Sequence, residues 1–142
     1  MIKIGKNISE FSVYSCQPKT KDELNEIIKD RIYKHGYECD LNDIDTSLIE
    51  DMSWLFCESE FNGDISGWNV SNVKYMEWMF NRSVFNKDIS NWDVSKVEDM
   101  ECMFRESDFN KDISNWNIHN CNTNRMFKNK SIKDSYKPKV LR

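Results

Sequence analysis

A repeat of 24 residues constrains this chain more than any other feature of its sequence. From Asp40 onward the sequence reads as four lines, DLNDIDTSLIEDMSWLFCESEFNG, DISGWNVSNVKYMEWMFNRSVFNK, DISNWDVSKVEDMECMFRESDFNK and DISNWNIHNCNTNRMFKNKSIKD. The fourth line is one residue shorter near Asn122 and then loses the pattern. Self-similarity at this period is typical of repeat proteins, in which each unit packs only on its neighbours.

Apolar residues recur at equivalent positions of the units, and we expect these columns to form the core. The columns are Leu41, Ile65, Ile89 and Ile113; Ile44, Trp68, Trp92 and Trp116; Thr46, Val70, Val94 and Ile118; Ile49, Val73, Val97 and Cys121; Met52, Met76 and Met100; Leu55, Met79, Met103 and Met126; Phe56, Phe80, Phe104 and Phe127; Phe61, Phe85, Phe109 and Ile132. Asn62, Asn86 and Asn110 form a further column that is expected to bond loop backbones from one unit to the next.

The pattern within one unit predicts a strand followed by a helix. Residues 68–70 alternate apolar and polar, which is typical of a short strand. Val73, Met76, Met79 and Phe80 then recur at helical spacing. The predicted fold class is therefore α/β, a short right-handed β/α solenoid with a parallel sheet along one side and an N-terminal α+β cap.

The N-terminal part is expected to cap the open end of this solenoid. Short strands are predicted at Lys3–Gly5 and Phe11–Cys16, followed by a helix over residues 20–35, with Thr20 and Glu23 as a capping box. We divide the chain into a cap over residues 1–39, a four-unit solenoid over residues 40–134 and a basic tail over residues 135–142.

Charge is distributed unevenly over a chain with a formal net charge of −4. Residues 37–124 carry six Lys or Arg against 18 Asp or Glu, a charge of −12, whereas residues 125–142 carry +6 and are expected to be solvated. An acidic body argues against direct nucleic-acid binding. No apolar run is long enough for a signal peptide or a membrane span, so a cytoplasmic location is expected.

The chemistry-bearing residues do not form a recognisable catalytic or metal-binding set. Five cysteines at irregular spacing, without a CxxC pair, favour neither disulfides nor zinc. Cys121 falls in a core column, and Asp64, Asp88 and Asp112 fall where turn capping is expected. We therefore expect no enzymatic activity, no catalytic residues, no metal and no cofactor.

The pattern DISxWxVSxVxxMxxMFxxSxFN resembles the BspA-like leucine-rich repeats of mycoplasma-type lipoproteins and many bacterial surface proteins. The segment PKTKDELNEIIKDRI, followed by DLNDIDTSLIEDMSWLF, is similar to the module that often precedes those repeats. The resemblance implies a solenoid that binds other proteins, with no cofactor and no catalysis. Many members are secreted or lipid-anchored adhesins.

Trp54 and Trp78 are exceptions to the expectation that large apolar side chains are buried, because the helical wheel of the predicted helix places them on its outer face. Large apolar side chains on adjacent units often mark a contact surface. The candidate partner-binding residues are Trp54, Trp78, Tyr75, Arg82, Glu50, Asp51, Glu77, Glu98, Asp99 and Glu101. The alternative is that the indoles lie flat and only cover the solenoid. A second candidate face consists of Asp45, Asn69, Asp93 and Asn117.

These observations favour a non-enzymatic protein–protein interaction module. We expect a small intracellular inhibitor or adaptor, by analogy from a phage or other mobile element, that occupies a protein with a basic or mixed surface. A bacterial surface adhesin is one alternative. An acidic mimic of nucleic acid that blocks a basic groove is the other, and it predicts affinity that falls steeply with salt. No membrane partner is expected.

Overall fold

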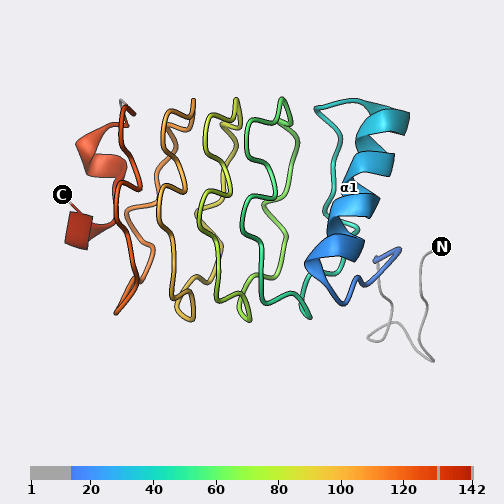
Figure 1. The fold of residues 1–142 in the computed structure, drawn as a ribbon, viewed down its shortest axis with the longest axis horizontal. Coiled ribbons are helices and arrows are strands. Elements are labelled where there is room, and N and C mark those ends of the chain that lie inside the picture. Colours follow the sequence, from blue (N-terminus) through green and yellow to red (C-terminus); the bar gives the residue numbers. More distant parts are fainter. Residues whose placement is uncertain (1–13, 131, 142) are drawn as a thin grey trace.

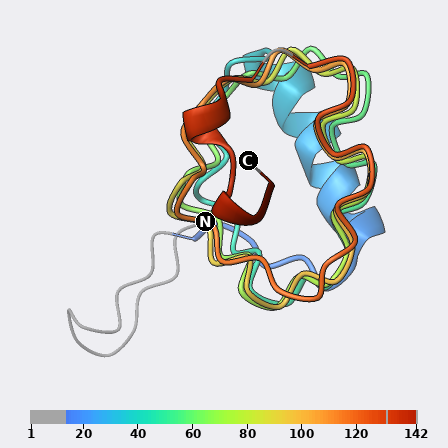
Figure 2. The ribbon, with the colours of Figure 1, turned by 90° about the vertical axis from the view of Figure 1, so that its left-hand side faces the viewer.

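The computed structural model describes residues 14–130 and 132–141, which form a row of stacked coils. The helix α1 (Lys21–His35) lies at one end of the row, and two short 3₁₀ helices, η2 (Asp134–Tyr136) and η3 (Lys139–Leu141), lie at the other (Figure 1). Seen along the row, the backbones of successive coils superpose (Figure 2). Each sequence repeat therefore makes one circuit around a common axis.

The prediction of a β/α solenoid is wrong. Within the described ranges α1 is the only α-helix, and there is no β-strand and no sheet. Neighbouring coils meet instead at isolated parallel bridges, which join Cys16 to Ile44, Asp51 to Tyr75, Tyr75 to Asp99, and Asp99 to Asn122. The strand predicted at Lys3–Gly5 lies outside the described residues, as do residues 11–13 of the second predicted strand.

The segment that was predicted as a helix is a series of turns. Its alternate backbone N–H groups donate to the next coil, from Met76 to Asp99, from Trp78 to Glu101 and from Phe80 to Met103, at 2.8, 2.9 and 2.9 Å. A helix would use these groups for bonds within the segment. The intervening N–H groups close tight local turns, so the three- and four-residue apolar spacing arises without a helix.

The predicted strand at residues 68–70 also lacks its ladder. The Trp68 N–H donates locally to the carbonyl of Ile65 at 3.1 Å. The carbonyl of Asn69 accepts a bond from the buried Thr46 hydroxyl at 2.9 Å, so a side chain takes the place of a strand partner. The alternating pattern therefore records which residues face the core, and it does not report a sheet.

The apolar columns are confirmed as the core. Most of their members are buried, and the phenylalanines stack along the row, with ring centroids 5.6 Å apart from Phe56 to Phe80, 5.5 Å to Phe104 and 5.6 Å to Phe127. The indole N–H groups of Trp68, Trp92 and Trp116 donate to carbonyls of the preceding coil at 3.0, 3.1 and 3.1 Å. The buried tryptophans thus satisfy their polar atom while they fill the core.

The asparagine column bonds the loops as expected. The side-chain oxygens of Asn62, Asn86 and Asn110 accept the backbone N–H of the equivalent residue in the next coil, at 2.9, 2.8 and 3.1 Å. Asp64, Asp88 and Asp112 cap their own turns by accepting the N–H two residues on, at 2.9, 2.8 and 2.9 Å. Both of these roles for the repeated polar residues are confirmed.

Replacing Asn86 with alanine is expected to lower the free energy of unfolding by about 1 kcal/mol, because the Asn110 N–H loses its acceptor. Urea denaturation checks the loss. The control is Asn91→Ala, at an exposed position, where a change within about 0.5 kcal/mol is expected. Equal losses at the two positions would contradict the ladder.

The helix α1 packs on the first coil. The Thr20 side chain accepts the Glu23 N–H at 3.2 Å, as a capping box requires. The Glu23 carboxylate, however, accepts the backbone N–H of Lys19 and not that of Thr20. Leu24 and Ile28 are buried in the core. The Arg31 guanidinium donates to the Asp43 carboxylate at 2.7 Å and attaches the helix to the coil.

The C-terminal segment folds back onto the last coil, where a solvated tail was expected. The Ile113 N–H donates to the carbonyl of Tyr136 at 2.9 Å, Pro138 is buried, and Leu141 packs against the core. Both ends of the row therefore carry added structure.

Candidate functional site

The turn segment of each coil determines where the candidate side chains lie. Trp54 and Glu58 have positive φ angles of 63° and 56°, and their equivalents in the second coil, Trp78 and Arg82, have 60° and 54°. Such conformations cost roughly 1–2 kcal/mol per residue. They recur in every coil and are therefore part of the repeat geometry. The bonds between coils offset their cost, and equivalent side chains leave the backbone in the same direction.

Trp54 and Trp78 stack face to face at the surface. Their ring centroids are 4.9 Å apart and their planes differ by 7°. Trp54 is 53% exposed, and Trp78 is partly buried. The next member of this column, Cys102, is buried, so the aromatic surface stops after two coils. The two indole rings lie flat against each other, whereas the covering alternative expected them to lie flat over the solenoid. About half of Trp54 is exposed to solvent.

Arg105 lies against the same stack. Its guanidinium carbon is 5.9 Å from the Trp78 ring centroid, within the range of a cation–π contact. A salt bridge of 3.2 Å to Glu106 holds the guanidinium. Sequence reasoning missed Arg105, although its place three residues after Cys102 in the next coil was the available signal.

Tyr75 and a group of carboxylates lie beside the tryptophans. Tyr75 is 42% exposed and bridges Asp51 and Asp99 through its backbone. We name Trp54, Tyr75 and Trp78, with Asp51, Glu77 and Asp99, the aromatic–acidic surface. The structure thus brings these six predicted residues together.

The carboxylates of this surface are incompletely neutralised. Lys21 of α1 lies 3.5 Å from the Asp51 carboxylate. Burial raises the pKa of Asp51, but bonds from Ser53 and the charge of Lys21 outweigh it, so this pKa lies below its usual value. Burial, followed by the charges of Asp99 and Asp51, raises the pKa of Glu77, and its buried Oε2 has no hydrogen-bond partner among the residues that the structure describes.

Arg82, a predicted partner-binding residue, pairs with carboxylates outside the aromatic–acidic surface. Its side chain lies between Glu106, at 2.6 Å, and Glu58, at 3.7 Å, in a ladder of charges along the row. Glu50 pairs with Lys74 at 3.2 Å. These exposed pairs contribute little to stability. Of the remaining candidates, Glu98 is exposed and Glu101 is partly buried.

The second candidate face is mainly a row of turn caps. Asp45, Asn69 and Asp93 each accept the N–H two residues on, at 3.0, 3.0 and 3.1 Å, and Asn117 is exposed. Their oxygens therefore hold their own backbone, which leaves fewer acceptors for a partner.

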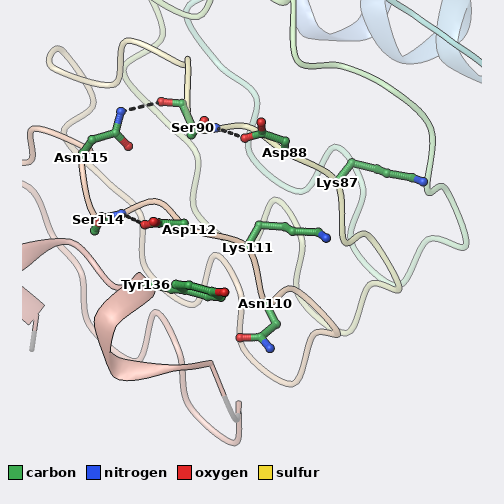
Figure 3. A pocket seen from close by; sticks show the side chains of 9 residues that line it. All are labelled: Lys87, Asp88, Ser90, Asn110, Lys111, Asp112, Ser114, Asn115 and Tyr136. Carbon is green, nitrogen blue, oxygen red and sulfur yellow. Dashed lines mark hydrogen bonds between the residues drawn. The ribbon is translucent and has the colours of Figure 1, made fainter.

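An open groove of about 640 Å³ lies near the C-terminal end, and sequence reasoning missed it. Figure 3 shows Lys87 and Lys111 extending in parallel, with Tyr136 lying below them. Asp88 and Asp112 also line the groove, but they cap their turns through Ser90 and Ser114. The groove depends on the fold-back of Tyr136, which no repeat pattern indicates.

Cys121, which was assigned to the core, is partly buried against it. Burial, reinforced by the charge of Asp99, raises the pKa of its thiol to about 11. A protonated thiol is a poor nucleophile and a poor metal ligand. Over residues 14–130 and 132–141, no group of three His, Cys, Asp or Glu side chains is placed to hold a metal ion.

Acidification is expected to destabilise the chain. The Arg31 hydrogen bond lowers the pKa of Asp43, and backbone N–H bonds lower those of Asp64 and Asp88. These groups stabilise the fold above the ordinary value of 3.8, and their contribution is lost as the pH falls through their lowered values. The pKa of Glu77 is raised, so protonation of this one group stabilises the fold and opposes the loss from the other carboxylates.

Thermal melting between pH 6 and pH 2.5 checks this expectation. The melting temperature should fall from about pH 4 downward, and more gently in Asp43→Asn, which has lost one of the lowered groups. A melting temperature that rises on acidification would contradict the assignment.

No helix in the described part of the chain is long and apolar enough to span a membrane. The model of a family described as Mycoplasma protein of unknown function, DUF285, matches residues 24–137. No curated protein and no solved structure matches the chain. The matched range includes most of α1 and all four repeats.

Proposed function

Because the chain belongs to the DUF285 family of Mycoplasma proteins, whose description assigns no activity, we propose its function from its surface. The chain is a non-enzymatic module that binds another protein through the aromatic–acidic surface. In this role it acts as an inhibitor or adaptor, by occupying its partner.

One observation supports this proposal above the others, which is the exposed stack of Trp54 on Trp78. Trp54 is 53% exposed, whereas Cys102, the third member of the same repeat column, is buried. Exposed aromatic groups flanked by polar residues are typical of contact surfaces, and Trp and Tyr are enriched among residues that dominate binding energy. The surrounding carboxylates favour a partner with a basic or mixed surface.

Replacing Trp54 with alanine is expected to weaken partner binding roughly 10- to 30-fold. The free energy of unfolding should fall by only about 1 kcal/mol, since the residue is half exposed and loses one stacking contact. Capture from a host lysate with quantitative mass spectrometry measures the first effect, and urea denaturation measures the second.

The matched control is Tyr33→Ala, which removes an aromatic ring that is 90% exposed on α1. This variant should capture the partner as well as the parent chain does. A large loss of stability in Trp54→Ala with unchanged capture would reject the proposal and would assign the indoles a covering role.

The acidic-mimic alternative is weaker, because Asp45, Asn69 and Asp93 use an oxygen on their own turns. Binding that falls by several orders of magnitude between low and high salt would favour it over the aromatic surface.

The proposal also retains two finer points from the sequence. One is kinship of the repeat pattern with BspA-like repeats, supported by the tryptophan and phenylalanine columns. The other is an intracellular site of action, which cell fractionation tests against the adhesin alternative. An origin in a phage or mobile element stays an analogy, and examination of neighbouring genes tests it.

A further inference from the structure

The Trp54–Trp78 stack ends differently on its two sides. Trp54, Trp78 and Arg105 belong to the first, second and third coils, and successive coils stack in order (Figure 1). Arg105 therefore covers the Trp78 face opposite Trp54. Both faces of Trp78 are occupied, one by an indole and one by a guanidinium.

Among the described residues, Trp54 has one aromatic contact, the stack with Trp78. The nearby cation on α1, Lys21, donates to the Ser53 hydroxyl at 3.0 Å and pairs with Asp51, so it is held beside the backbone. Among the described residues, no Lys or Arg lies over the Trp54 ring. By the order of the coils, the ring face of Trp54 opposite Trp78 is on the α1 side of the first coil, which also carries Asp51.

The charges near the tryptophans favour a further cation. Lys21 is one positive charge among three carboxylates, those of Asp51, Glu77 and Asp99. A cation near unneutralised carboxylates is stabilised, and over an indole it gains an additional cation–π attraction. A guanidinium suits both contacts better than an ammonium does, since it is planar and presents donors at its edges.

We infer, on the basis of the proposed function, that the partner presents an arginine on a basic segment, and that this arginine stacks on the face of Trp54 opposite Trp78. The partner's arginine would add a second guanidinium to the stack of Arg105, Trp78 and Trp54, on the Trp54 end. The neighbouring carboxylates select the positive charge, and the ring face selects the planar group. The proposed occupant is a separate protein and not the basic C-terminal segment of the same chain, which packs at the opposite end of the row (Figure 1).

The test uses two synthetic peptides with three spaced basic residues, GSRGSRGSRG and its lysine counterpart GSKGSKGSKG. Titration calorimetry with the full chain measures both dissociation constants. The arginine peptide is expected to bind about 3- to 30-fold more tightly than the lysine peptide. Trp54→Ala should remove this difference, and Tyr33→Ala should preserve it.

The inference is overturned by equal binding of the two peptides, by binding of neither, or by an arginine preference that persists in Trp54→Ala. A dimer that Trp54→Ala dissociates, seen by sedimentation, would overturn it in favour of a second copy as the occupant. Peptide failure together with loss of lysate capture in Trp54→Ala leaves the proposed function standing. Unchanged capture in Trp54→Ala rejects the proposed function itself.

Discussion

Replacing Phe80 with alanine is expected to lower the free energy of unfolding by about 3–5 kcal/mol. Phe80 has no solvent exposure, and its ring centroid lies 5.6 Å from Phe56, 5.5 Å from Phe104 and 4.5 Å from Phe85. The cavity would be enclosed by rings of three coils, which cannot all move inward. Since the net stability of a domain of this size is about 5–15 kcal/mol, this loss is a large fraction of it.

The matched control for Phe80 is Phe127→Ala, at the end of the same column. Phe127 is partly exposed and stacks on Phe104 alone within the column, so a loss of less than half that of Phe80→Ala is expected. Urea denaturation of both variants gives the comparison. Equal losses would show that the phenylalanine column is not a continuous stack.

Replacing Gly63 with alanine is expected to destabilise the chain by about 3 kcal/mol or more. A Cβ atom at this position would lie 1.9 Å from the backbone carbonyl of Cys39 and 2.8 Å from the Phe61 ring. A backbone carbonyl cannot rotate away as a side chain can. The Asn62 N–H also donates to the carbonyl of Tyr37 at 2.8 Å, so the substitution separates the cap from the first coil where they are joined.

Gly67→Ala is the control for this second prediction. Its Cβ atom would meet the Asn42 side-chain oxygen at 3.0 Å, and that side chain can rotate. A loss of about 1 kcal/mol or less is expected. Thermal melting separates the variants, and a Gly63→Ala chain as stable as Gly67→Ala would contradict the close contact between the cap and the first coil.

The sequence allowed the buried columns to be predicted but not the backbone that carries them. The positions of Met76, Met79 and Phe80 satisfy a helical wheel and a series of turns equally well. The choice between these structures depends on N–H groups that reach the next coil and on positive φ angles at Trp78 and Arg82. Neither quantity has a signature in the spacing of side chains.

Local signals predicted the cap helix correctly, because the Thr20 side chain acts on the Glu23 N–H, only three residues along the chain. The requirement for Gly63 could not be predicted, since its equivalents in the later coils are Lys87 and Lys111. Only the approach of the Cys39 carbonyl explains the glycine, and that approach is a long-range contact.

The candidate site was predicted only in part, because the sequence shows which residues share a column but not which columns are in contact. A shared column placed Trp54 above Trp78, and columns also grouped the carboxylates. The contact of Arg105 with Trp78 joins two different columns, so the repeat pattern alone does not indicate it. The capping bonds of Asp45 and Asp93 likewise became visible only with the backbone in place.

Nuclear magnetic resonance of the isotopically labelled chain tests the stacked-coil account most directly. Carbon chemical shifts should show a continuous α-helix over residues 21–35 and none over residues 71–82, and the Trp54 and Trp78 indole protons should show cross-relaxation with each other. Helical chemical shifts across residues 71–82 and the equivalent segments of the other coils would contradict the account. Cross-relaxation of the two indoles with the buried methionines, and not with each other, would also contradict it.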